Sequence, residues 1–98
     1  MIQNKYTIIS GIKSMKNQLT RRFHGEVIGI FGSYARDEAT QKSDLDILVR
    51  FNENATLIDL VGMSQYLESK LKCNVDILSD KAMKKEFEPY IKNDLIAI

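Results

Sequence analysis

Residues 26–51 read EVIGIFGSYARDEATQKSDLDILVRF, two short apolar runs joined by a polar loop. The runs at residues 26–31 and 45–51 are rich in β-branched and aromatic residues, which favours β-strands. Gly25 and Gly32 bound the first run, and residues 39–43 before the second are polar. We therefore expect two strands, linked by a segment in which residues 33–36 can form one or two helical turns.

Helical spacing of apolar residues is found on both sides of this stretch. Before it, the apolar positions recur at steps of four, three and four, which predicts a helix over approximately residues 4–22 with one stripe for docking: Ile8, Ile12, Met15 and Leu19. After it, residues 52–55 form a turn and Thr56 is an expected N-cap. An apolar stripe then predicts a helix over residues 57–71.

The last quarter of the chain supplies a third strand and a last helix. Residues 74–78 are expected to form the strand, and the spacing of Phe87, Tyr90 and Ile91 indicates a helix from Lys81, with Pro89 in its first turn or breaking it. Residues 95–98 are expected to add an edge strand.

The order of these elements is α-β-α-β-α-β-α, which predicts an α/β (α+β) domain. A helix joins the second and third strands, so they should be parallel with a right-handed crossover. The short link after the first strand permits an antiparallel pair. We therefore expect a small mixed sheet of three to four strands with helices packed on it.

The length of 98 residues suits one domain, spanning 1–98. A composition with 44% hydrophobic and 28% charged residues is typical of a globular protein. Cys73 is the single cysteine, so no internal disulfide is expected. The sequence shows neither a secretion-signal pattern nor an apolar run of about 20 residues, so we expect a cytoplasmic protein without a membrane segment.

Charge is distributed unevenly along the chain. Residues 1–25 hold five lysines and arginines and no acid, although the whole chain has a net charge of only +1. Such a segment can meet phosphate, nucleic acid or an acidic partner. Because aromatic residues do not interleave with these charges in the pattern of a nucleic-acid-binding surface, a solvated helix face is favoured over nucleic-acid binding.

Three aspartates stand in or beside the apolar strands. Asp44 and Asp46 are two residues apart, so strand alternation directs both to one face. Asp76, between Val75 and Ile77, reaches the same patch if the third strand lies beside the second. Crowded carboxylates call for a cation, and oxygen ligands with open positions suit magnesium or manganese better than zinc.

A phosphate-binding turn is expected next to these acids. Gly32 and Ser33 follow the first strand, where the missing β-carbon lets a phosphate approach the backbone and Ser33 can donate its hydroxyl. Arg36 offers a charged fork for phosphate. Its alternative role is an ion pair with Glu38 or with an acid of the site.

These motifs resemble a known family. Gly32-Ser33, ten intervening residues and Asp44-Leu45-Asp46 resemble the signature of the DNA polymerase beta superfamily of nucleotidyltransferases. The segments FGSYAR, SDLDILV and VDIL are similar to its minimal nucleotidyltransferase branch, stand-alone domains often encoded beside a HEPN-domain partner. The resemblance spans approximately residues 5–95.

The resemblance implies the nucleotidyltransferase fold and roles for individual residues. Asp44 and Asp46 would be ligands of two Mg²⁺ ions, Ser33 would contact the triphosphate, and Asp76 would be the third ligand and the base. One departure is Asp37, which stands where glycine is expected.

The acceptor is the open question, because the chain has no residues left for an acceptor-binding domain. A protein partner or a homo-oligomer could complete the site. The resemblance points to an MntA-type antitoxin of a HEPN/MNT toxin–antitoxin pair, transferring AMP from ATP, or a nucleotide from another nucleoside triphosphate, to a tyrosine hydroxyl of a HEPN-type toxin. Alternatives are an aminoglycoside-like small acceptor, or an antitoxin that only occludes its partner, against which the retained aspartates argue.

Overall fold

A computed structural model describes residues 4–98 of the chain. Four helices, four strands and one short 3-10 turn follow one another in the described part: α1 (Lys5–Phe23), β1 (Gly25–Phe31), α2 (Gly32–Ala35), β2 (Leu45–Phe51), α3 (Leu57–Leu71), β3 (Val75–Ser79), η1 (Asp80–Ala82), α4 (Glu88–Asp94) and β4 (Ile96–Ala97). The expected order of helices and strands is confirmed, with η1 added before the last helix.

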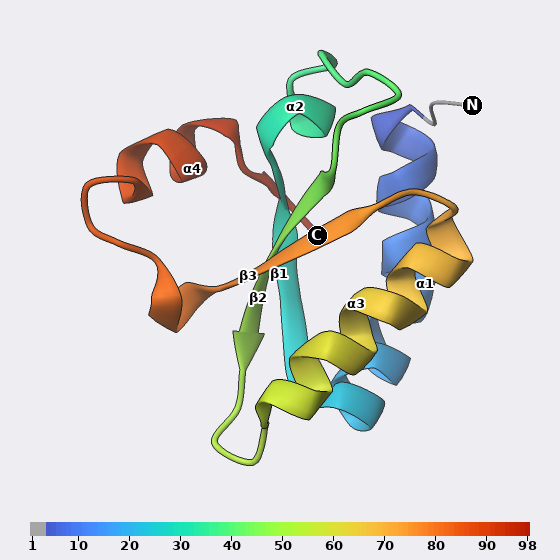
Figure 1. The fold of residues 1–98 in the computed structure, drawn as a ribbon, viewed down its shortest axis with the longest axis vertical. Helices are drawn as coiled ribbons and strands as arrows, with labels where there is room; N and C mark the ends of the chain where they lie inside the picture. Colours follow the sequence, from blue (N-terminus) through green and yellow to red (C-terminus); the bar gives the residue numbers. More distant parts are fainter. Residues whose placement is uncertain (1–3) are drawn as a thin grey trace.

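The strands form one mixed sheet in the order β3-β2-β1-β4. β1 pairs antiparallel with both β2 and β4, whereas β2 and β3 are parallel and joined through α3. Figure 1 shows α1 and α3 together on one side of the sheet and α4 on the other. The parallel pairing of β2 with β3 and the antiparallel pairing of β1 with β2 are those expected from the lengths of the connections.

The core lies between the sheet and the α1/α3 layer. Its fully buried side chains are Ile8, Ile12 and Leu19 of α1, Val27 and Ile30 of β1, Leu45, Ile47 and Val49 of β2, and Met63 and Leu67 of α3. Burying each large apolar side chain stabilises the fold by about 1.5–3 kcal/mol. The expected stripe of α1 is confirmed, although Met15 is only partly buried.

Local hydrogen bonds define where the two long helices begin. The Asn4 side chain accepts from the backbone N–H of Thr7 at 2.9 Å at the start of α1. Thr56 is the N-cap of α3, as expected, and its N–H donates to Asp59 Oδ2 at 2.9 Å. Such contacts satisfy groups that have no partner within the helix.

The last helix differs from the sequence prediction. It begins at Glu88 and not at Lys81, because residues 80–82 form the 3-10 turn η1 first. Pro89 lies in the first turn of α4, where its missing N–H leaves no helical bond unmade. The third strand spans Val75–Ser79, one residue later than expected, and the edge strand is Ile96–Ala97. No helix in the described part of the chain is long and apolar enough to cross a bilayer.

Candidate active site

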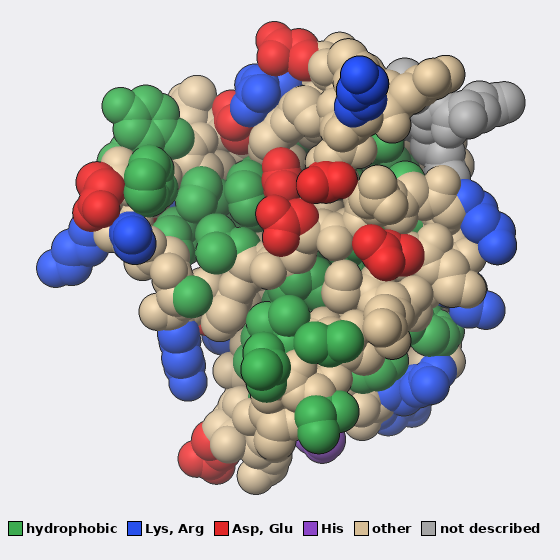
Figure 2. Space-filling view, viewed as in Figure 1, with side chains coloured by type: hydrophobic (Ala, Val, Ile, Leu, Met, Phe, Trp, Pro, Cys, Tyr) green, Lys and Arg blue, Asp and Glu red, His purple; other side chains and the backbone are tan. Residues whose placement is uncertain are grey.

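The sheet register brings two of the three aspartates side by side. Asp46 of β2 and Asp76 of β3 are paired positions in neighbouring parallel strands, and Asp44 directly precedes β2. On its other side Asp46 is paired with Phe31, the last residue of β1. Figure 2 shows acidic side chains gathered near the centre of this face of the molecule. The structure thus places the predicted acids at one end of the sheet.

Burial and charge act together on Asp46. Its side chain is partly buried, whereas Asp44 and Asp76 are exposed. Burial first, and then the charges of Asp76 and Asp44, raise the pKa of Asp46 to about 6, while Arg36 acts in the opposite direction. None of the three aspartates forms an ion pair with another residue in the described range 4–98. The site therefore carries negative charge that the described chain leaves unpaired.

The turn after β1 lies directly against this carboxylate. Gly32 has φ of 76°, a left-handed conformation that L side chains rarely adopt. A β-carbon added at Gly32 would overlap Asp46 Oδ2. Ser33 follows in the first turn of α2, and its carbonyl accepts from the N–H of Glu38 at 2.8 Å. Glycine is thus required for the backbone to pass this close to the acid.

Arg36 is held by two carboxylates. Its Nε donates to Glu38 Oε2 at 3.0 Å, and its Nη1 donates to Asp94 Oδ2 at 2.6 Å. The ion pair with Glu38 was one of the two roles considered from the sequence. Asp94 was not predicted, because it is 58 residues away and no local pattern links the two. A role for Arg36 in phosphate binding would require it to leave these partners.

Asp37 adopts a left-handed backbone conformation, which explains why the family pattern has glycine at this position. Its φ is 59°, in the left-handed region where glycine is favoured. The side chain of Asp37 forms an ion pair with Lys5 Nζ at 3.1 Å, which connects the loop to the start of α1. Aspartate thus replaces the expected glycine at position 37, and the left-handed turn is still formed.

Tyr34 and Cys73 lie behind the aspartates. Tyr34 is 5% exposed, and its pKa is raised chiefly by burial and then by the neighbouring Cys73 thiol. Burial likewise raises the pKa of Cys73, which is a free cysteine. Neither group therefore has the lowered pKa of an activated nucleophile, and Tyr34 belongs to the buried core.

The donor set fits a magnesium–triphosphate complex better than a closed metal site. Within residues 4–98 no group of three or more His, Cys, Asp or Glu side chains is gathered tightly enough to hold a metal ion alone. Magnesium usually binds one or two carboxylates together with phosphate oxygens. Two adjacent strand carboxylates beside a glycine turn supply that combination: Asp46, Asp76 and Gly32.

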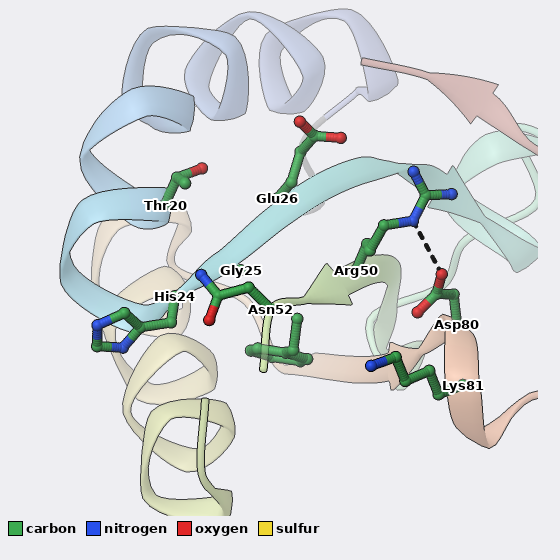
Figure 3. A pocket seen from close by; sticks show the side chains of 9 residues that line it. Thr20, His24, Gly25, Glu26, Arg50, Asn52, Asp80 and Lys81 are labelled. Atoms are coloured by element: carbon green, nitrogen blue, oxygen red, sulfur yellow. Dashed lines mark hydrogen bonds and ion pairs between the residues drawn. The ribbon is translucent and has the colours of Figure 1, made fainter. Parts of the chain in front are cut away.

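A pocket lies at the end of the strands opposite to the aspartates (Figure 3). It has a volume of about 540 Å³, and its polar lining includes Glu26, Asn52 and Lys81. Arg50 Nε donates to Asp80 Oδ2 at 3.0 Å on its rim. These residues come from separate segments of the chain and share no motif, so no sequence pattern indicates this pocket. The pocket lacks the pairing of glycine turn and carboxylates found at the aspartate end.

Comparisons with known proteins agree with this geometry. The sequence profile of the nucleotidyltransferase domain family matches residues 12–97. Protein adenylyltransferase MntA of Thermococcus cleftensis is 34% identical over 91 residues, which cover 93% of this chain and 92% of the relative. A solved structure provisionally assigned as a minimal nucleotidyltransferase superposes with a TM-score of 0.82 at 30% identity, covering 98% of this chain and 97% of the other.

A more distant structure supports the fold alone. It is a toxin–antitoxin crystal structure with AMP-PNP, with a TM-score of 0.69 at 22% identity over 87% of this chain and 70% of the other. Family profile, relative and fold lead to the same assignment. The chain belongs to the nucleotidyltransferase domain family, in its minimal nucleotidyltransferase branch.

Proposed function

We propose that this nucleotidyltransferase is the antitoxin enzyme of a toxin–antitoxin pair, transferring AMP from ATP to a tyrosine hydroxyl of a HEPN-type toxin in the cytoplasm. The observation that carries the proposal is the pairing of Asp46 with Asp76 against the Gly32 turn. The relative from Thermococcus cleftensis, a protein adenylyltransferase aligned over nearly its full length, supports a protein acceptor.

The triphosphate would lie over the glycine turn and beside the aspartates. The backbone at Gly32 and the Ser33 hydroxyl would contact the triphosphate, and Asp44, Asp46 and Asp76 would hold two magnesium ions. When bound, these ions neutralise the phosphates and the leaving group and lower the pKa of the acceptor hydroxyl. Manganese offers the same preference for oxygen ligands.

The transfer requires one bond to form, one to break and one proton to move. The tyrosine oxygen bonds to the α-phosphorus while the bond from that phosphorus to the bridging oxygen of the β-phosphate breaks, and pyrophosphate leaves. A carboxylate oxygen of Asp76, exposed at the edge of the site, accepts the tyrosine proton. The protein therefore contributes positioning and charge, and forms no covalent intermediate.

Co-expression with the proposed toxin tests this function. The HEPN-domain protein is purified after expression with the wild type, with an Asp44→Asn, Asp46→Asn double variant, or with Glu53→Gln, which alters an exposed acid in the turn after β2. We expect added AMP in the intact mass, and loss of toxicity, with the wild type and Glu53→Gln only. Neutralisation without added mass by the double variant would instead establish occlusion. Modification of an aminoglycoside but of no protein would establish a small acceptor.

A further inference from the structure

Two aromatic side chains of the last helical segment are exposed to solvent. Phe87 is 54% exposed and Tyr90 73%, and they are three residues apart at the start of α4, so they lie on neighbouring positions of one face. Figure 2 shows hydrophobic side chains gathered over α4, beside the acidic centre of the same face. Exposed aromatic groups of this kind are characteristic of protein-binding surfaces.

A groove connects α4 with the strand that carries Asp46. It has a volume of about 320 Å³, and half of its lining is apolar: Ile28, Leu48, Met83 and Leu95. The other half consists of two ion pairs, Arg50 with Asp80 and Lys92 with Glu88, whose charges compensate each other. Leu48 is two residues beyond Asp46 in β2, so the two side chains are on the same face and about 7 Å apart along the strand. A chain segment with an apolar side chain in this groove thus needs only about two extended residues to reach the aspartates.

The charges around this surface favour an acidic occupant. Residues 81–87 hold three lysines and one acid, Glu86, and none of these four forms an ion pair with another residue in the described part of the chain. The charge of Lys92, in contrast, is compensated by Glu88 at 2.6 Å. The net positive charge of residues 81–87, beside a groove with apolar side chains, attracts a segment that combines acidic residues with an apolar anchor.

We propose that the α4 surface, defined as Phe87, Tyr90, Lys84 and Lys85 together with the groove between α4 and β2, docks an acidic segment of the acceptor protein. An apolar side chain of that segment fills the groove and places the acceptor hydroxyl at Asp46 and Asp76. The inference rests on the proposed function in one respect, namely that the acceptor is a protein. It adds the surface that the acceptor contacts and the chemistry of the contacting segment.

A second apolar patch provides a matched control. Leu57 and Ile58 at the start of α3 are 74% and 82% exposed, more than the aromatic residues of α4. They follow β2, whereas Asp46 lies near its beginning, so this patch is at the opposite end of the strand. Removing it changes exposed apolar area to a similar degree without touching the proposed route to the aspartates.

The experiment measures binding of the purified HEPN-domain protein by calorimetry, separately from AMP transfer. Three double variants are compared with the wild type: Phe87→Ala with Tyr90→Ala, Lys84→Glu with Lys85→Glu, and the control Leu57→Ala with Ile58→Ala. We expect about 10- to 100-fold weaker binding for the first two and wild-type binding for the control. Raised salt should weaken wild-type binding and leave the lysine variant less affected.

Affinity for magnesium-ATP, measured on each variant alone, reports on nucleotide binding. Unchanged partner binding by the two α4 variants, or equal loss in the α3 control, would overturn the docking proposal. Weaker ATP binding with unchanged partner binding would also overturn it, because the aromatic residues would then serve the nucleotide. Binding that depends on α4 without any AMP transfer by the wild type would refute the proposed function and leave the docking surface standing.

Discussion

Asp46 of β2 and Asp76 of β3 occupy paired positions in adjacent parallel strands, and neither forms an ion pair within the described chain. The pairing follows from the α3 crossover, which makes the two strands parallel and sets their register. Like charges in such positions destabilise the protein without ligand and favour binding of a cation. The charges that weaken the empty fold are therefore those that a magnesium–nucleotide complex would neutralise.

Replacing Asp46 with asparagine should stabilise the metal-free protein at neutral pH. The pKa of Asp46 is raised from 3.8 to about 6 in the folded state. The contribution of the protonated Asp46 carboxyl to the free energy of unfolding is therefore fully present below about pH 4 and is lost as the pH rises through 6. The shift corresponds to at most about 3 kcal/mol, and solvent screening reduces the expected gain to about 1–2 kcal/mol. Urea unfolding of the wild type and of Asp46→Asn, in chelator from pH 4 to pH 8, measures this difference in the free energy of unfolding.

The difference between Asp46→Asn and the wild type should be small at pH 4 and largest near pH 8. Glu53→Gln, in an exposed turn, serves as the control and should show no such trend. A variant that is less stable than the wild type at pH 8 would mean that Asp46 is a structural partner and not a repelled ligand.

Alanine at position 32 should affect both folding and nucleotide binding. The left-handed φ of 76° and the overlap of the new β-carbon with the Asp46 carboxylate should together lower the free energy of unfolding by about 1–3 kcal/mol. Gly11→Ala in α1 is the matched control, since its β-carbon would meet only a flexible Leu71 methyl at 3.3 Å. Unfolding midpoints compare the stability of the Gly32→Ala and Gly11→Ala variants, and calorimetry with ATP compares their nucleotide binding. Equal behaviour of both variants would refute the steric role of Gly32.

Local patterns were sufficient to predict most of the fold. The apolar stripe of α1, the two runs that became β1 and β2 and the N-cap at Thr56 are short-range signals, and each is observed. The start of α4 was wrong because spacing alone does not show that residues 80–82 close a 3-10 turn first. Periodicity describes which face an element buries, and not where it begins.

The site divides in the same way. Alternation along β2 and the glycine turn could be read locally, and the parallel direction of β3 followed from the crossover. The register that pairs Asp46 with Asp76 comes from the structure. The contact of Arg36 with Asp94 joins residues 58 apart and depends on where α4 packs, so no sequence pattern indicated it. Long-range ion pairs require the tertiary structure.

Glycine at position 37 should stabilise the protein slightly. Relief of the left-handed φ of 59° is worth about 1 kcal/mol, and the lost ion pair with Lys5, in which the Asp37 carboxylate is exposed, contributes less. We expect the free energy of unfolding to rise by about 0.5 kcal/mol. Lys72→Gly, at φ 58° at the end of α3, is the control without an ion pair to a described residue. A loss of stability in Asp37→Gly, with a gain in Lys72→Gly, would show that the Lys5 contact outweighs the strain.

Removing Asp94 should release Arg36 toward the phosphates. Asp94 accepts from Arg36 at 2.6 Å, so Asp94→Asn leaves the guanidinium with Glu38 as its remaining charged partner. If Arg36 binds phosphate after leaving these partners, the variant should bind ATP about two- to fivefold more tightly, since the competing anion is gone. Glu86→Gln, an exposed acid that forms no ion pair with a described residue, is the control. Weaker ATP binding by Asp94→Asn would show that Arg36 acts only by positioning the loop.

Binding of ATP should depend on magnesium, because the nucleotide must otherwise bring its negative charge to three aspartates that lack cationic partners in the described chain. Calorimetry in chelator should therefore give at least about tenfold weaker binding than in magnesium. Manganese should restore the affinity for ATP. Zinc prefers nitrogen and sulfur ligands and should neither restore this affinity nor support AMP transfer. The Asp44→Asn, Asp46→Asn variant supplies the decisive comparison. With less repulsion it should bind ATP in chelator better than the wild type does, and it should gain little from magnesium. Equal wild-type affinity with and without magnesium would show that the triphosphate is held by the protein alone, and the aspartates would then need another role.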